Sequence, residues 1–491
     1  MTKKCLGVAT LLLALSCPAA AQDAKAVVAN AAKAMGSENL SAITYYGSGA
    51  NFGLGQSNNA NGQWPRTNVS DYVRSIDFTQ STSRATGQTF AAPVTGGPAA
   101  AGVFQQNITP ANTAWAQQLE IWITPWGFLK GAAANNATAK SQTIGGKKYN
   151  VVTWNTTQKA PSGVPYKVVG YLNDQNLVEK VETWLENPIF GDMLVEALYS
   201  EYRDANGVKY PAAIVQNRGG QPTFEAQILG INANPRNIAQ LVTPPGGGQR
   251  GGGAPGGAPP AGGAAPAPAG PTSEKLADGV YRINGAYNAL AVEFADHILI
   301  FEPGPQNDMR AQAIIAEAKR AIPNKPIRYG VISHHHFDHT SGLPAVVAEG
   351  ITIVTHEVNK AFLERALAAP RTLAPDAMSK SGKKAKIETV GDKRVFQDAT
   401  RTFEVHLIKG LPHVDGLLVG YLPKEKILVY ADMFNIPPAA DPVPNPPVVG
   451  TMVFMDNVDR LKLDVDRIMS VHALAPDRLT SVAEIKKSIG R

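Results

Sequence analysis

Four histidines and one aspartate fall within six consecutive residues, inside the stretch Ser333-His-His-His-Phe-Asp-His-Thr-Ser-Gly342. The apolar run at 327–332 predicts a short buried strand before it, and Thr-Ser-Gly predicts a turn into a helix. His334 and His336 lie two apart and can face the same way as the strand ends. Imidazole nitrogens and carboxylate oxygens are ligands that Zn²⁺ takes at about 2.0–2.2 Å. A solvated cluster or a tag is the alternative, but a tag would lie at a terminus without the interleaved Phe337 and aspartate. Without a cation, such packing would leave unsatisfied or repelling groups, so the stretch predicts a metal site.

The N-terminus has the layout of a secretory signal peptide at residues 1–21. Two lysines precede an apolar core at 6–15, and three alanines offer a cleavage site after Ala21. The apolar core is too short to anchor the chain in a membrane. A lipoprotein acylated at Cys17 is the second choice, because Ala14 stands where that signal usually has leucine. We therefore expect a periplasmic or secreted protein.

Cleavage after Ala21 would remove both cysteines, Cys5 and Cys17, so the mature chain would offer no cysteine ligand or nucleophile. Loss of Lys3 and Lys4 would take the net charge from +6 to +4 across the remaining 470 of 491 residues. A net charge this small, without a block of lysines or arginines, does not indicate nucleic-acid binding. We expect a small-molecule substrate and, since no later run reaches about 18 apolar residues, no transmembrane segment.

Length alone predicts more than one domain in a chain of 491 residues. Residues 22–243 read as successive hairpins with one helix near 23–35, which predicts a mostly antiparallel β domain, curved or half-closed. This layout faintly resembles periplasmic lipoprotein-carrier-like half-barrels. Trp122 and Trp126 could line an apolar groove, although core positions are favoured. The domain's role stays open between a structural part and a site for an apolar or lipid-like ligand or a protein partner.

Residues 244–272 are nearly all glycine, proline and alanine. Such a segment cannot bury enough apolar surface to offset its ordering entropy, so it predicts a disordered linker between loosely tethered domains. All six tryptophans precede it and all nine histidines follow it, which supports two units with different tasks. Residues 273–491 alternate strands with helices, from strands at 280–301 through a helix near 458–465 to a terminal helix at 481–489.

The pattern His334-x-His336-x-Asp338-His339 resembles the signature of the metallo-β-lactamase superfamily, whose fold is an αββα sandwich around one or two metals. The resemblance covers 273–491 and extends to three later motifs at strand ends. These carry His413 in Gly-Leu-Pro-His-Val-Asp-Gly, Asp432 in Tyr-Ala-Asp-Met, and His472 after a final strand. The resemblance implies two metal sites that share a bridging Asp432. It assigns His334, His336 and His413 to one metal, and Asp338, His339 and His472 to the other.

This sequence departs from the family's pattern beside two of these motifs. Ala431 stands where the bridging motif usually has glycine, which leaves the backbone less free. Glu302 stands where an aspartate often follows the early strand, a position that supports the loop more than the metals. The remaining histidines are interpreted as structural: His335 as exposed or supporting, His356 as a helix cap, and His297 and His406 as strand residues. Asp415 could accept a hydrogen bond from a ligand histidine.

The resemblance implies a dinuclear zinc-dependent hydrolase in which a metal-bridging hydroxide attacks an ester, thioester or lactone. Asp338 would orient the nucleophile as well as bind metal. Two Zn²⁺ per chain are expected, with iron or manganese possible. The alternatives are a zinc β-lactamase, disfavoured because Met433 replaces a usual serine, and an iron-dependent oxidoreductase or a non-catalytic binding protein on the same fold. Loops at 435–449 and 370–384 are predicted to wall the site.

Overall fold

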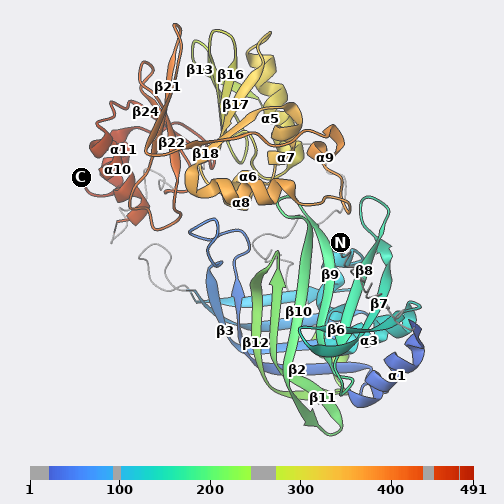
Figure 1. Ribbon diagram of the computed structural model, residues 1–491. Coiled ribbons are helices and arrows are strands. Elements are labelled where there is room, and N and C mark those ends of the chain that lie inside the picture. The colour runs from blue at the N-terminus through green and yellow to red at the C-terminus, as the bar shows by residue number, and fades with distance from the viewer. Residues whose placement is uncertain (1–20, 92–100, 245–271, 435–446, 475) are drawn as a thin grey trace, which may run out of the picture.

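The computed structural model describes residues 21–91, 101–244, 272–434, 447–474 and 476–491. The predicted signal peptide up to residue 20, the linker and most of the predicted wall at 435–449 lie outside these residues. Two domains lie side by side, with a large curved sheet in the lower half of Figure 1 and a layered domain in the upper half. No helix among the described residues is long and apolar enough to cross a membrane.

The N-terminal domain is one twelve-stranded sheet in which all neighbours are antiparallel, in the order β1-β6-β7-β8-β9-β10-β11-β12-β2-β3-β4-β5. Its strands are β1 (Ala21–Gln22), β2 (Ala42–Phe52), β3 (Arg66–Asp77), β4 (Thr82–Ala91), β5 (Ala101–Ile108), β6 (Thr138–Ile144), β7 (Lys147–Lys159), β8 (Pro165–Leu172), β9 (Val178–Asn187), β10 (Gly191–Ala205), β11 (Val208–Arg218) and β12 (Gln221–Ala233). The predicted hairpin between β10 and β11 turns through Asn206 and Gly207, both at positive φ, as a two-residue turn requires. The predicted antiparallel sheet is confirmed.

The prediction of a single helix in this domain is wrong. Besides α1 (Ala24–Ala34), the domain has α2 (Trp115–Trp122), α3 (Pro125–Ala134) and α4 (Ile238–Val242). α3 starts where it does because Thr124 accepts a hydrogen bond from the Gly127 backbone at 3.1 Å and Pro125 takes the first turn.

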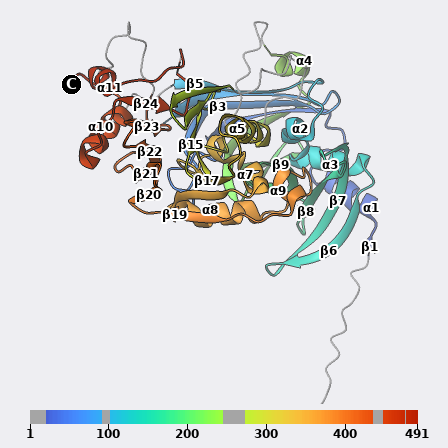
Figure 2. The ribbon, with the colours of Figure 1, turned by 90° about the horizontal axis from the view of Figure 1, so that it is seen from above.

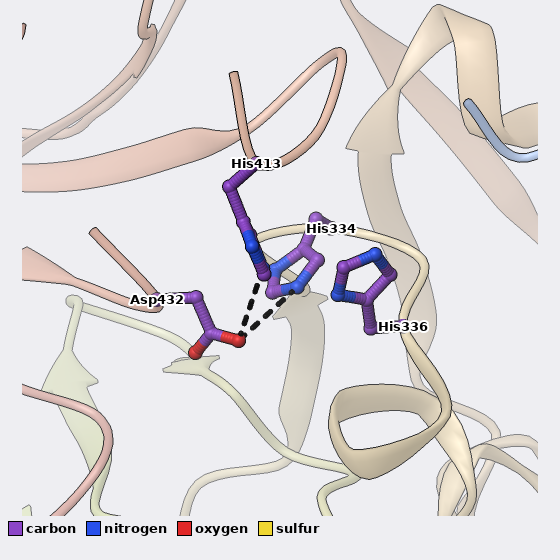
Figure 3. A group of neighbouring side chains, drawn as sticks. All are labelled: His334, His336, His413 and Asp432. Carbon is purple, nitrogen blue, oxygen red and sulfur yellow. Dashed lines mark ion pairs between the residues drawn. The ribbon is translucent and has the colours of Figure 1, made fainter. Parts of the chain in front are cut away.

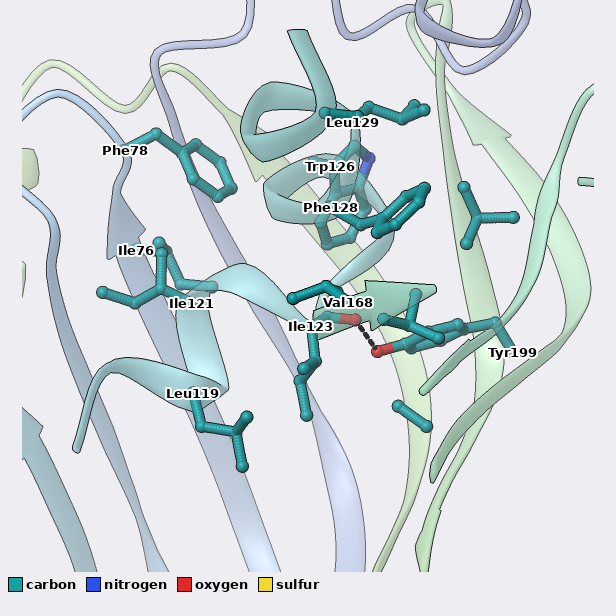
Figure 4. Packing of buried hydrophobic residues seen from close by; sticks show 14 of the residues in the cluster. Ile76, Phe78, Leu119, Ile121, Ile123, Trp126, Phe128, Leu129, Val168 and Tyr199 are labelled. Carbon is teal, nitrogen blue, oxygen red and sulfur yellow. Dashed lines mark hydrogen bonds between the residues drawn. The ribbon is translucent and has the colours of Figure 1, made fainter. Parts of the chain in front are cut away.

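The helices α2 and α3 lie between the two arms of the curved sheet (Figure 4). Trp126 is 2% exposed, and Tyr199 donates to the carbonyl oxygen of Ile123 at 2.6 Å. Trp126 is therefore a core residue, and the side chains of α2 and α3 fill the space inside the curved sheet.

The C-terminal domain has a seven-stranded sheet, in the order β13 to β19, and a five-stranded sheet, in the order β20 to β24. The first contains β13 (Ser273–Ala277), β14 (Val280–Ile283), β15 (Ala289–Glu293), β16 (Ile298–Phe301), β17 (Ile327–Val331), β18 (Thr352–His356) and β19 (Ile387–Val390). The second contains β20 (Lys393–Gln397), β21 (Thr402–Leu407), β22 (Leu418–Leu422), β23 (Ile427–Tyr430) and β24 (Arg467–Ser470). Strands β16 to β19 run parallel, as do β23 and β24.

Three apolar layers join these sheets and their helices into an αββα sandwich, which confirms the predicted fold (Figure 2). The helices are α5 (Asp308–Ala321), α6 (Phe337–Thr340), α7 (Leu343–Glu349), α8 (Glu357–Ala368), α9 (Ala377–Ser381), α10 (Val449–Leu461) and α11 (Val482–Ser488). Phe301 and Phe403 meet between the sheets, Ile314 packs outside the first and Phe454 outside the second. A helix predicted near 458–465 instead ends at Leu461, because Lys462 adopts a left-handed conformation.

The expectation of loosely tethered domains is corrected, because the two domains share a core. Leu54, Trp64 and Ile189 of the N-terminal domain belong to the same buried cluster as α5, α7 and α8. The loop at 370–384, predicted as a rim of the site, instead docks on the N-terminal domain. Arg371 donates to the carbonyl oxygens of Pro188 and Ile189 at 2.9 and 3.1 Å.

Candidate metal centre

The predicted ligands meet where strands of both sheets end. His334 and His336 leave the end of β17, and Asp338 and His339 occupy the one-turn helix α6. The other three residues come from the second sheet: His413 between β21 and β22, Asp432 after β23 and His472 after β24. Since parallel strands end at the same edge, residues up to 138 positions apart in sequence converge there.

The first group consists of His334, His336, His413 and Asp432, whose ligand atoms all lie within 4.8 Å of one another (Figure 3). Oδ2 of Asp432 is 3.6 Å from Nε2 of His334 and 3.4 Å from Nε2 of His413. Among the described residues, Nε2 of His334, Nδ1 of His336 and Nε2 of His413 are buried and have no hydrogen-bond partner. Three unpartnered nitrogens directed at one point are a donor set that a cation would satisfy.

The second group consists of Asp338, His339, His472 and Asp432. Nε2 of His339 is 3.4 Å from Oδ2 of Asp338, 3.0 Å from Oδ1 of Asp432 and 3.3 Å from Nε2 of His472. Ligand atoms about 2.0–2.1 Å from a tetrahedral ion are roughly 3.3 Å apart, so these separations suit such an ion.

Asp432 joins the two groups because each of its oxygens faces a different one. Oδ2 faces the first group, and Oδ1 lies 2.6 Å from Nε2 of His472 in the second. The residue has φ +51°, a left-handed conformation that aspartate tolerates better than most side chains. Ala431 is outside that region, so the expected constraint from alanine does not arise. The two His/Asp groups are consistent with a dinuclear metal site.

Glu302 and Tyr287 hold the second group in place. Glu302 is fully buried at φ +61°, and it accepts from Nδ1 of His339 at 2.9 Å and from the Ser333 backbone at 2.6 Å. Tyr287 donates to Oδ2 of Asp338 at 3.0 Å, and its ring lies 4.4 Å from that of His472. Partners of this kind fix the tautomer and orientation of metal-binding side chains. Glu302 was expected to support the loop more than the metals, and it does both through Ser333 and His339; Tyr287 carries no motif that could have revealed it.

Charge divides the site into neutral and ionised parts. Burial, reinforced by neighbouring histidines, lowers the pKa of His334 well below its usual value and that of His336 to about 4. Burial would also lower the pKa of His339, but the carboxylates of Asp432 and Glu302 raise it far above its usual range. Burial acts to raise the pKa of Asp432, but the surrounding histidines hold it well below its usual range. His334 and His336 are thus uncharged, as imidazoles that bind a metal must be, while the carboxylates around His339 favour a positive charge there.

The histidines interpreted as structural lie outside both groups. His335 is buried with Nε2 3.2 Å from Oγ of Ser57, and His297 stacks on Phe294. His406 pairs with Glu404, as His297 does with Asp296. His356 caps α8 by accepting from the Val358 backbone at 3.3 Å, as predicted.

The suggestion that Asp415 supports a ligand histidine is wrong. Asp415 accepts from Nδ2 of Asn59 at 3.2 Å, and no described histidine bonds to it. Its backbone nitrogen donates to the carbonyl oxygen of Asn58 at 2.7 Å. Both partners belong to the N-terminal domain, which the sequence motifs could not connect to this site.

Known proteins resemble the C-terminal part of the chain. Residues 283–472 match the family model described as the metallo-beta-lactamase superfamily, and the match leaves the N-terminal domain unassigned. No curated protein matches the sequence. Solved structures similar to the chain include a metallo-beta-lactamase from Pontibacter korlensis (15% identity, TM-score 0.32, 45% of this chain and 97% of that one). Others are a metallo-beta-lactamase from Hirschia baltica (17%, 0.34, 45% and 96%) and rubredoxin oxygen:oxidoreductase from Desulfovibrio gigas (17%, 0.33, 45% and 61%). Residues 283–472 of this chain form a metallo-beta-lactamase superfamily domain.

Proposed function

We propose that the chain is an exported hydrolase that uses two zinc ions to cleave an ester, thioester or lactone. The observation that carries the proposal is the division of Asp432 between the groups, with one oxygen directed at each. A single structural zinc would need only one closed set of four ligands. Two linked sets, each with a partly exposed member, favour a site that meets substrate.

His334, His336 and His413 would hold one ion, Asp338, His339 and His472 the other, and Asp432 both. When bound, two such ions supply an acidified water and positive charge for the oxyanion that develops in hydrolysis. His413 and His472 have 23% and 33% of their side-chain surface exposed, whereas His334 and His339 are fully buried. Substrate would therefore approach from the side of His413 and His472.

Asp338 would position the nucleophile. Its carboxylate receives a hydrogen bond on each oxygen, from Gln56 at 3.2 Å and from Tyr287 at 3.0 Å, so its orientation is fixed. Burial acts to raise the pKa of Asp338. Nearby His339 and the two hydrogen bonds that Asp338 accepts outweigh burial and keep this pKa below its usual value. An ionised carboxylate held in this way can accept a proton or hydrogen bond from an attacking water.

The choice of ester, thioester or lactone over β-lactam rests on the residue after Asp432. Met433 is buried and packs in the core cluster beneath α10, so it presents no polar group to the site. A serine at that position, as in the related exported zinc β-lactamases that the sequence resembles, would be polar. The iron-dependent and non-catalytic alternatives differ from the proposal in measurable metal content and activity.

The test is metal analysis of the full exported chain purified without chelators, followed by a substrate panel. We expect two zinc ions per chain and hydrolysis of a thioester, an aryl ester or an acyl lactone in preference to nitrocefin. His336→Ala removes a ligand and should abolish activity, while His406→Gln, on β21 away from both groups, serves as the matched control. Fewer than one ion per chain after zinc is restored, or unchanged activity in His336→Ala, would overturn the proposal. Activity on nitrocefin alone would favour the β-lactamase alternative.

A further inference from the structure

The loop 53–65 joins β2 to β3 in the N-terminal sheet and lies against the C-terminal domain, where it is blue in Figure 1. We propose that this loop is a working part of the metal centre, in which Ser57 and Gln56 position two ligands supplied by the other domain. The inference rests on the proposed function, because it concerns the same ligands. It assigns the N-terminal domain a direct role in metal binding.

Ser57 determines which nitrogen of His336 is free. The backbone carbonyl oxygen of Ser57 lies 3.0 Å from Nε2 of His336, and a carbonyl can only accept a hydrogen bond. Nε2 must therefore carry the proton, which leaves Nδ1 with its lone pair. Nδ1 of His336 faces the first group. It is buried and has no hydrogen-bond partner among the described residues. Ser57 thus selects the tautomer that can bind a metal.

Gln56 fixes the orientation of the second ligand, Asp338. Its Nε2 donates to Oδ1 of Asp338 at 3.2 Å, while Tyr287 donates to Oδ2. Oδ2 is also the oxygen that lies 3.4 Å from Nε2 of His339. A donor on Oδ1 therefore sets the rotation of the carboxylate that brings Oδ2 to the second group.

The loop is seated firmly enough to hold these positions. Leu54 and Trp64 are buried in the core of the C-terminal domain, and Asn58 bonds through both its side chain and its carbonyl to the loop that carries His413. Gly55 has φ +77°, and a Cβ there would lie 2.3 Å from the ring of Phe337, so the backbone contacts the metal-binding segment directly. The loop bridges the first-sheet and second-sheet halves of the site.

A purely structural role would predict that any lost hydrogen bond in this loop has the same effect. Gln56 and Asn59 make it possible to separate the two cases, because the Asn59 side chain bonds at 3.2 Å to Asp415, which belongs to neither group. Gln56→Ala removes a contact to a ligand. Asn59→Ala is its matched control, since it removes a contact of the same length between the same loop and the C-terminal domain.

The experiment measures zinc affinity of the full chain by competition with a chromophoric chelator, starting from metal-free protein whose folding is checked by circular dichroism. We expect Gln56→Ala to weaken the second zinc about 10- to 100-fold, the usual effect of losing a partner of a metal ligand. Asn59→Ala should match the wild type. Equal weakening in both variants, or none in Gln56→Ala, would overturn the inference. If wild type binds two ions and hydrolyses the substrate panel as expected, the proposed function stands whatever the variants do; if it binds none, both proposals fail.

The role of the Ser57 carbonyl needs a separate measurement, because no side-chain substitution removes a backbone carbonyl. In metal-free wild type labelled with ¹⁵N-histidine, the His336 resonances, assigned by their loss in His336→Gln, should show the tautomer protonated at Nε2. Protonation at Nδ1 would overturn the role of Ser57.

Discussion

Ser57 accepts a hydrogen bond from His336 at 3.0 Å across 279 positions of sequence. The contact joins a loop of the N-terminal sheet to a residue of the metallo-beta-lactamase superfamily domain, so the metal centre extends beyond the family's own sequence. The two domains accordingly act as one unit at the site, and the following predictions probe its parts separately.

Tyr287→Phe removes the hydroxyl that donates to Asp338 and keeps the ring packed beside His472. We expect metal affinity at the second group and hydrolysis to fall about 10-fold, at the low end for a lost partner of a ligand. The thermal unfolding temperature should change little, because the ring's packing is retained. Tyr287→Ala, which loses both, should lower that temperature as well. Wild-type zinc affinity in Tyr287→Phe would show that Gln56 alone orients the carboxylate.

Glu302→Gln replaces the acceptor of His339 by an amide without changing its size. Glu302 now accepts from both His339 and the Ser333 backbone, and one amide oxygen cannot serve both. His339 should then be free to take the tautomer with a proton on Nε2. That nitrogen faces the second group and, once protonated, could not bind a metal there. We expect zinc affinity to drop about 10- to 100-fold, measured by chelator competition. A variant that retained both zinc ions at wild-type affinity would contradict this role for Glu302.

His356→Asn tests a pH dependence away from the metals. Burial lowers the pKa of His356, which in its neutral form caps α8. The unfolded chain, with a histidine pKa of about 6.5, takes up the proton more readily, so the contribution to stability is lost as pH falls below that value. Asparagine can cap without titrating in this range.

Urea denaturation from pH 8 to pH 5 should therefore show a gap between the two proteins. Wild type is expected to lose more unfolding free energy on acidification than His356→Asn, with similar values at pH 8. Parallel curves would show that protonation of His356 is not linked to folding.

Arg371→Ala tests the coupling of the domains. Arg371 is 7% exposed, and its guanidinium bonds to two carbonyl oxygens of the N-terminal domain. Leaving buried acceptors unsatisfied costs about 1–3 kcal/mol each, so the interface should weaken by roughly 2 kcal/mol or more. Five of the six tryptophans pack in or against the core of the N-terminal domain, so tryptophan fluorescence reports mainly that domain, while far-ultraviolet circular dichroism reports both domains.

The two signals should coincide during urea unfolding of the wild type and separate in Arg371→Ala. Arg328→Ala, which breaks an exposed pair with Asp296, is the control and should unfold as wild type does. Separate transitions already in wild type would mean that the shared core does not couple the domains.

Much of the fold was readable from local patterns. The turn residues Asn206-Gly207 between two strand-like runs predicted a hairpin, since turn signals act over short distances. The structure adds that burial alternates along β9 and β10. The helix α2 was missed because its burial is supplied by the arms of the sheet, which only folding brings together. The limits of α10 were misplaced because a left-handed Lys462 ends it without a glycine signal.

The sequence by itself determined the ligand chemistry: imidazoles and carboxylates at strand ends, with spacings that a superfamily motif preserves. Only the tertiary structure decided their partners, because a hydrogen bond such as that between Gln56 and Asp338 depends on two domains meeting and leaves no periodicity in either segment. A glycine- and proline-rich linker suggested independent domains, yet shared apolar burial through Trp64 and Ile189 joins them. Local sequence encodes which groups are available, and packing decides which of them face one another.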